Sequence, residues 1–187
     1  TVNLLESIRH IPTVRSVLNV TTDKVYENND MEQHAFTEEE KLDGFDPYSN
    51  SKSCSEILTH SYQKSFFNEE KEENGQRVLP RISTARAGNV IGGGDFAKDR
   101  IIPDAVRAVV RGQKIGVRNP YSVRPYQHVL EPLLVYLEIA ARQAGYVKGL
   151  SKETFSYLEG KRYASQYNVA PSVEDAIHTG ELVGLFT

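Results

Sequence analysis

The sequence has one cysteine, Cys54, no tryptophan and only five histidines in 187 residues. One cysteine cannot form an internal disulfide, and we expect Cys54 to be a small helix residue near the core. The scattered histidines show no metal-ligand spacing, so no metal site is expected. No hydrophobic run is long enough to cross a bilayer, and the net charge of −3 comes without a basic stripe. These absences favour a globular chain whose partner is neither nucleic acid nor a membrane.

The chain starts at Thr1, without an initiating methionine, and directly enters a helical pattern. Because a domain seldom begins inside a packing helix, we expect this chain to be a piece of a longer protein.

Predicted helices and strands alternate along the chain. We expect helices over 1–10, 47–67, 101–111, 132–144 and 172–186, and strands over 16–20, 78–87, 114–117 and 163–169. This order predicts an α/β fold with a doubly wound parallel sheet covered on both faces. Ligands of such sheets bind beyond the carboxyl ends of the strands, where Thr22, Asp23 and Asn89 are expected.

Tyr48 and Lys52 are the residue pair that best indicates chemistry. Residues four apart on a helix lie on the same face, so the phenol and the ammonium would reach one site. A nearby cation favours phenolate over phenol, which turns a tyrosine into a base for a sugar hydroxyl. The same lysine has donors left for a cofactor's ribose.

The same spacing occurs a second time, at Tyr157 and Lys161, so spacing alone does not decide. Asp46 and Pro47 before Tyr48 predict a helix start. An amphipathic helix is expected to follow, and its apolar residues are Ile57, Leu58, Tyr62, Phe66 and Phe67. The second pair has a glycine inside it and no polar cluster upstream, so we interpret it as structural.

Five motifs together resemble the extended short-chain dehydrogenase/reductases that act on nucleotide sugars, which include NAD-dependent epimerases and dehydratases. The motifs are Thr21-Thr22-Asp23-Lys24-Val25-Tyr26, Asp46-Pro47-Tyr48-Ser49-Asn50-Ser51-Lys52, residues 84–95, Arg100-Ile101-Ile102-Pro103, and Arg118-Asn119-Pro120 running into residues 124–132. Within this family the chain is most similar to the 4,6-dehydratases of CDP-glucose. The resemblance implies a Rossmann-like sheet, here incomplete, with a small C-terminal substrate-binding part.

The resemblance also implies a reaction. Tyr48, assisted by Thr22 and Lys52, would take the proton of the 4-hydroxyl while hydride passes to NAD. Water would then leave across carbons 5 and 6 with Asp23 as the acid, and the hydride would return to carbon 6. The implied product, CDP-4-keto-6-deoxyglucose, is a precursor of dideoxy sugars in bacterial surface polysaccharide (lipopolysaccharide O-antigen), made in the cytoplasm.

Further site residues follow from the same resemblance. Thr21, Tyr48 and Lys52 would bind the cofactor NAD. Arg100 and Arg124 carry planar, permanent charges that suit a diphosphate, and the Asn89 amide can bind phosphate or sugar oxygens; these three would hold the substrate.

Two departures from the family pattern affect these expectations, and the glycine run 92–94 allows two interpretations. Many related dehydratases carry Glu after the catalytic Asp as the base for carbon 5, whereas this chain has Lys24, which is typical of the CDP-glucose branch and makes Lys24 a catalytic candidate. Tyr126 stands where that branch usually has Trp. The run Gly92–Gly94 lacks dinucleotide spacing, so it is either a phosphate cradle or a flexible turn.

The glycine-rich dinucleotide fingerprint of the family would precede Thr1, so we expect this chain alone to bind NAD poorly or not at all. We assign 1–92 to the C-terminal portion of the Rossmann-like domain and 93–187 mostly to nucleotide-sugar binding. The full-length protein is expected to be a homodimer or higher oligomer. Two alternatives stay open: another epimerase or dehydratase of this fold, and a truncated, inactive domain that binds a nucleotide sugar or a protein partner.

Overall fold

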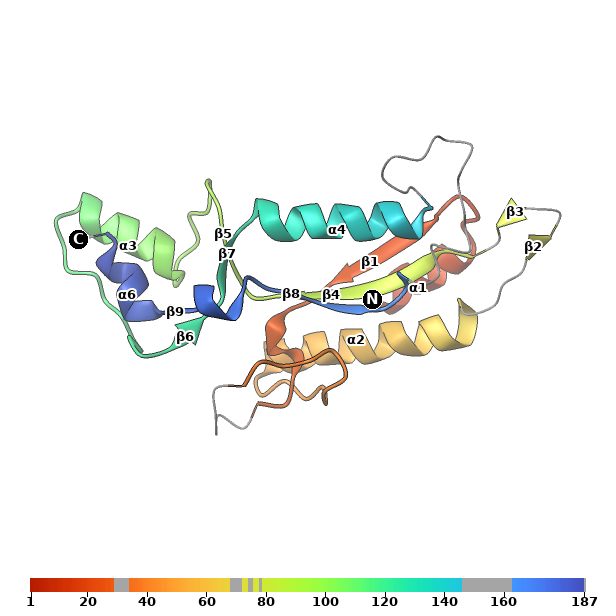
Figure 1. Ribbon diagram of the computed structural model, residues 1–187, viewed down its shortest axis with the longest axis horizontal. Helices are drawn as coiled ribbons and strands as arrows, with labels where there is room; N and C mark the ends of the chain where they lie inside the picture. Colours follow the sequence, from red (N-terminus) through yellow and green to blue (C-terminus); the bar gives the residue numbers. More distant parts are fainter. Residues whose placement is uncertain (29–33, 68–71, 74–75, 78, 146–162, 187) are drawn as a thin grey trace. The chain divides into compact units, whose positions relative to one another are not determined.

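The computed structural model describes residues 1–28, 34–67, 72–73, 76–77, 79–145 and 163–186 (Figure 1). The predicted pair Tyr157 and Lys161 lies outside these residues. The elements, in chain order, are α1 (Val2–Arg9), β1 (Ser16–Val20), η1 (Asp23–Val25), α2 (Pro47–Phe66), β2 (Glu72–Glu73), β3 (Gln76–Arg77), β4 (Arg81–Ala87), β5 (Asn89–Ile91), α3 (Ile101–Val110), β6 (Val123–Arg124), β7 (Tyr126–His128), α4 (Leu130–Gln143), β8 (Gln166–Val169), η3 (Val173–Asp175), β9 (Ile177–His178) and α6 (Thr179–Gly184).

The described residues form two compact units. The first comprises Thr1–Ala87 and Leu133–Val169, and the second comprises Gly88–Pro132 and Ala170–Thr187.

A three-stranded parallel sheet in the order β1-β4-β8 is the centre of the first unit. Ser16 of β1 pairs with Arg81 of β4, and Thr84 of β4 pairs with Gln166 of β8. All seven residues of β4 are buried, as expected for the central strand of a parallel sheet. The parallel α/β arrangement predicted from the element order is therefore confirmed.

Helices cover both faces of this sheet, with α2 and α4 on opposite sides (Figure 1). On one face, Ile82 packs with Leu5 and Ile8 of α1 and with Phe67 after α2. On the other face, neighbouring apolar residues form a second cluster that includes Tyr136 of α4: Ala85, Ala87, Val169, Leu18 and Tyr167. Alternate residues of β4 point to opposite faces, which divides the core into these two clusters.

The buried face of α2 is largely polar, and the apolar face predicted from the sequence is confirmed only near the C-terminal end, where Tyr62 and Phe67 pack in the core. Ile57 is 54% exposed and Phe66 is 40% exposed. The residues that α2 buries are Ser49, Ser53, Glu56 and Thr59. Their short hydroxyls bond to neighbouring groups: Ser53 donates to the Val25 carbonyl at 2.7 Å, and Asn19 donates to Thr59 at 2.9 Å. Cys54 is exposed on the same helix, so its expected place near the core is also wrong.

Two predicted elements of the second unit are wrong as well. Residues 114–117 form no strand; Gly112, with a φ of 61°, follows the end of α3, and no described strand pairs with this segment. The helix expected over 172–186 is broken into η3, β9 and α6. Ile177–His178 pairs antiparallel with Val123–Arg124, so strand pairing with a distant segment overrides the local helix signal.

Among the helices of the described ranges, none combines the length and the hydropathy that crossing a bilayer requires.

Candidate active site

The polar segment that follows β1 turns at once into η1. The N–H of Thr21 extends the sheet by donating to the Ala85 carbonyl at 2.8 Å. Thr22 begins η1, and its hydroxyl donates to Asp23 Oδ1 at 3.0 Å. Thr22 is buried, Asp23 is half-buried and Lys24 is exposed. The predicted position of these residues at the carboxyl end of a strand is confirmed.

The first turn of α2 starts where the sequence predicts. Asp46 caps the helix by accepting the N–H of Tyr48 at 2.9 Å and that of Ser49 at 3.1 Å, and Pro47 occupies the first turn. Gly44 approaches the backbone of Ser49 so closely that any Cβ there would overlap it. The loop before α2 is thus held tightly against the turn that carries Tyr48.

Asp46 makes the start of α2 sensitive to acid. Hydrogen bonds from the Ser49 hydroxyl and N–H lower the pKa of Asp46 below its usual value of 3.8. Because this folded-state pKa is depressed, the cap stabilises fully above about pH 4 and is lost as the pH falls below that value. The amide of Asp46→Asn caps without titrating. We therefore expect the melting temperature of this variant to fall by a few degrees less than that of the wild type between about pH 5 and pH 3.

Thermal melts across this pH range measure the effect. Asp43→Asn is the matched control, since Asp43 is an exposed carboxylate of the same loop that does not cap α2. Equal acid sensitivity of all three proteins would contradict the role of Asp46.

Tyr48 and Lys52 lie one turn apart at the start of α2. Tyr48 is 56% exposed and Lys52 is half-buried. Within the described ranges, neither the phenol nor the ammonium has a hydrogen-bond or ion-pair partner. Both groups are therefore available to a ligand.

A hydrogen bond holds η1 against the same end of α2, and a charge of η1 acts on the residue that caps the helix. The Ser53 hydroxyl, one residue beyond Lys52, donates to the Val25 carbonyl. The charge of Lys24 contributes to the lowered pKa of Asp46, two residues before Tyr48. The structure thus places the Thr22–Lys24 segment and the Tyr48–Lys52 turn on two elements that pack together.

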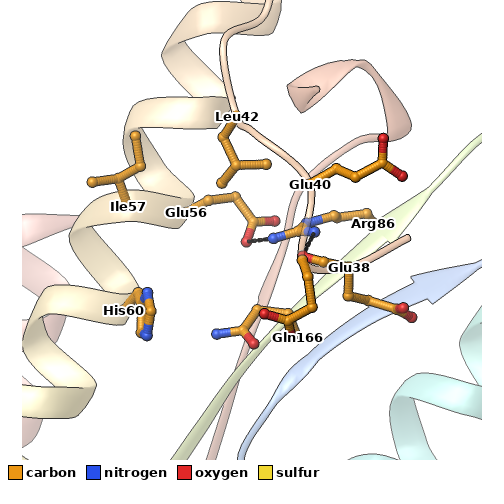
Figure 2. Close-up of a pocket in the computed structure, with 9 residues that line it drawn as sticks. Glu38, Glu40, Leu42, Glu56, Ile57, His60, Arg86 and Gln166 are labelled. Carbon is orange, nitrogen blue, oxygen red and sulfur yellow. Dashed lines mark hydrogen bonds and ion pairs between the residues drawn. The ribbon is translucent and has the colours of Figure 1, made fainter. Parts of the chain in front are cut away.

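The sequence interpretation missed a buried ion pair behind this site. Arg86 of β4 donates to Glu56 Oε2 at 3.1 Å, and the Thr21 hydroxyl donates to Glu56 Oε1. Figure 2 shows the pair in a pocket of about 220 Å³ that is also lined by His60 and Gln166. A charged residue inside a fully buried strand was the signal in the sequence. The Thr21 hydroxyl already donates to Glu56. Cofactor binding by Thr21 stays a prediction.

The three predicted substrate-binding residues belong to the second unit. Asn89 opens β5 and pairs with Tyr126 of β7, two residues after Arg124. Arg100 is exposed at the start of α3, and Arg124 is half-buried in β6. Within the described ranges, none of these three side chains has a hydrogen-bond or ion-pair partner.

The run Gly92–Gly94 has a structural explanation at two positions. A Cβ at Gly92 would come within 2.8 Å of Val129, and Gly94 has a φ of 81°. Residues 95–100 separate the run from α3, so it does not lead directly into a helix N-terminus. Phosphate binding by this run therefore stays a prediction.

The donor set of the first unit suits the ribose end of a dinucleotide better than its diphosphate. The free ammonium of Lys52 can donate to ribose hydroxyls, and the Tyr48 phenol lies one turn away. The arrangement can exchange a proton with an alcohol through Tyr48 and Thr22. It places the carboxyl group of Asp23 next to the Thr22 hydroxyl.

Comparisons with known proteins identify the family of the chain. Residues 1–146 match the family model described as NAD dependent epimerase/dehydratase family. A CDP-glucose 4,6-dehydratase of Salmonella typhimurium is 42% identical over 176 residues, which make up 94% of this chain and 44% of that protein.

Solved structures show the same fold. A dTDP-glucose 4,6-dehydratase from Bacillus anthracis, in complex with NAD, has a TM-score of 0.70 and 20% sequence identity. The match covers 99% of this chain and 49% of the dehydratase chain. A UDP-glucuronic acid 4-epimerase from Bacillus cereus, in complex with UDP-glucuronic acid and NAD, has a TM-score of 0.69 and 16% sequence identity. The match covers 98% of this chain and 48% of the epimerase chain.

The chain spans about half the length of these relatives. The family match extends over most of the chain and includes β1, η1, α2 and β4. This Rossmann-like α/β chain belongs to the NAD dependent epimerase/dehydratase family.

Proposed function

We propose that the chain is the catalytic part of a CDP-glucose 4,6-dehydratase, which converts CDP-glucose to CDP-4-keto-6-deoxyglucose. The observation that carries the proposal is the packing of η1, with Thr22 and Asp23, against the turn of α2 that presents Tyr48 and Lys52. The 42% identity to a CDP-glucose 4,6-dehydratase supports this substrate over other nucleotide sugars.

The first step is loss of a proton from the 4-hydroxyl of the sugar. Tyr48 takes this proton at its phenolate oxygen, Thr22 orients the hydroxyl, and Lys52 favours the phenolate by its charge. The same ammonium holds the ribose of NAD. When bound, NAD would supply the hydride chemistry at carbons 4 and 6 of the sugar.

The second step is loss of water across carbons 5 and 6. The 4-keto group acidifies carbon 5, and Asp23 delivers a proton to the departing 6-hydroxyl. Lys24 is exposed beside Asp23 and stays a catalytic candidate, while the base for the carbon 5 proton is unassigned.

The second unit supplies the substrate contacts. Arg100 and Arg124 bind the diphosphate through charge-assisted hydrogen bonds, and Asn89 binds phosphate or sugar oxygens. We place the reaction in the cytoplasm and expect the complete protein to form a homodimer or higher homo-oligomer.

Incubation of the complete gene product with CDP-glucose and NAD tests the proposal. We expect the strong alkaline absorbance of a 4-keto-6-deoxy sugar, and NMR should show a methyl group at carbon 6. dTDP-glucose is the matched control substrate and should react more slowly. Intact protein that leaves CDP-glucose unchanged would overturn the proposed function.

The same product analysis separates the alternatives. A product that keeps its 6-hydroxyl would identify an epimerase of this fold. The second candidate is a domain that binds a nucleotide sugar without turning it over. Calorimetry of the 187 residues would then give heat with CDP-glucose and none with NAD, whereas turnover by these residues alone would exclude this candidate.

A further inference from the structure

Glu56 lies on the same stripe of α2 as Tyr48 and Lys52. The three residues follow each other at intervals of four, so their side chains leave one face of the helix in successive turns. The stripe runs inward: Tyr48 is 56% exposed, Lys52 is half-buried and Glu56 is 1% exposed. Glu56 is thus the buried end of the row that begins with the two exposed groups.

Both carboxylate oxygens of Glu56 bind residues at the carboxyl ends of strands. Oε1 accepts the hydroxyl of Thr21, the residue directly before Thr22 and Asp23. Oε2 accepts Nη2 of Arg86, the penultimate residue of β4. One side chain therefore ties the helix that carries Tyr48 to the segment that carries Thr22.

Arg86 extends the connection to the third strand. Its Nη1 donates to the Tyr26 hydroxyl at 2.6 Å, and Tyr26 donates to Asn168 Oδ1 of β8, also at 2.6 Å. Within the described part of the chain, the Nε of Arg86 is buried without a partner. Figure 2 shows the guanidinium of Arg86, a residue of β4, pointing at Glu56 of α2.

Arg86 and Tyr26 keep their protons at neutral pH. Burial lowers the pKa of Arg86, but the hydrogen bonds and charges of Glu56 and Tyr26 together outweigh burial and raise the pKa above its usual value. Burial raises the pKa of Tyr26, although the hydrogen bond with Arg86 acts in the opposite direction. Tyr26 therefore keeps the proton that it donates to Asn168.

A buried ion pair is a poor way to gain stability alone. Well-packed apolar residues of similar volume often stabilise a fold as well or better, whereas directional bonds between charged groups can specify one register. Here the bonds fix the rotation and the height of α2 relative to the strand ends. That register sets where Tyr48 and Lys52 lie relative to Thr22 and Asp23.

We propose that Glu56 is a positioning residue, which holds the Tyr48–Lys52 face of α2 in register with the Thr22–Asp23 segment through its bonds to Thr21 and Arg86. The proposal deepens the proposed function and rests on it. Glu56 touches no reacting atom and acts through Tyr48 and Lys52.

Glu56→Gln in the complete gene product tests this role. The amide keeps the volume and can still accept the Thr21 hydroxyl, but its NH₂ cannot accept from Arg86. We expect kcat with CDP-glucose to fall on the order of 10- to 100-fold per folded molecule, because small misplacements of reacting groups carry costs of that size. KM should stay within about twofold, since the substrate contacts are unchanged.

A double-mutant cycle separates positioning from a merely structural role. If Glu56 acts through Tyr48, then Glu56→Gln should lower kcat in the wild type but have little further effect on Tyr48→Phe. Glu39→Gln is the matched control, because Glu39 lines the same pocket and is exposed. An unchanged kcat per folded molecule, or additive losses, would overturn the proposal.

If Glu56→Gln does not fold, Arg86→Lys replaces it in the test. Lysine keeps the charge but loses the planar fork, so we expect the same fall in kcat with an unchanged KM.

Amide hydrogen exchange provides a readout that needs no substrate. Faster exchange confined to residues 21–26 and the first turns of α2 supports the link, and unchanged or uniformly faster exchange refutes it. A wild type that leaves CDP-glucose untouched defeats the proposed function alone, and the exchange measurement still decides the role of Glu56.

Discussion

Tyr48→Phe is expected to lower kcat of the complete gene product with CDP-glucose by roughly 100- to 10,000-fold, the range for loss of a general acid or base. Phenylalanine keeps the ring and removes only the phenolic oxygen that would take the proton of the 4-hydroxyl. Because Tyr48 is more than half exposed and its hydroxyl has no partner in the described residues, the melting temperature should not change.

Single-turnover measurements of hydride transfer report the affected step directly. Tyr157→Phe is the matched control, since Tyr157 also stands four residues before a lysine. The control should keep the activity of the wild type. If Tyr157→Phe loses activity and Tyr48→Phe does not, the Tyr-Lys spacing has been assigned to the wrong copy. If neither variant loses activity, Tyr48 is not the base.

Asp23→Asn is expected to separate oxidation from elimination. The amide cannot deliver a proton to the departing 6-hydroxyl, so loss of water should slow by roughly 100- to 10,000-fold. Proton removal by Tyr48 should proceed, because Asn can still accept the Thr22 hydroxyl and so preserve the contact at the start of η1. Reduced nicotinamide should therefore accumulate, where the wild type shows little.

Rapid-mixing absorbance measures the reduced cofactor, and NMR measures the 6-deoxy product. Asp43→Asn makes the same chemical change at an exposed loop carboxylate and should behave like the wild type. Equal slowing of both steps by Asp23→Asn would assign Asp23 to the support of Thr22 instead of proton delivery. Elimination at the rate of the wild type would remove Asp23 as the acid.

Local signals explain why much of the first unit could be predicted. The strand at Ser16–Val20, the polar turn after it and the helix start at Asp46 and Pro47 depend on residues only a few positions apart. Cap preference, fixed proline φ and an apolar run before a polar turn all act at that range. Tyr48, Lys52, Thr22 and Asp23 could be singled out because these local elements carry them.

Longer-range pairing explains the errors. The helix expected over 172–186 gave way to β9, because Ile177–His178 bonds to a strand more than fifty residues earlier. The buried face of α2 was misjudged because Ser53 and Thr59 satisfy their hydroxyls within the fold, which composition does not reveal.

The sequence by itself determined the order of the elements, the start of α2 and the identity of the groups at the strand ends, since each follows from contacts between near neighbours. Only the tertiary structure decided that Glu56 is buried. A lone glutamate on a helix is ordinarily solvated, and desolvating its charge is costly without a partner. Arg86 and Thr21 provide that partner, and they reach Glu56 only because β1 and β4 pair in parallel under α2.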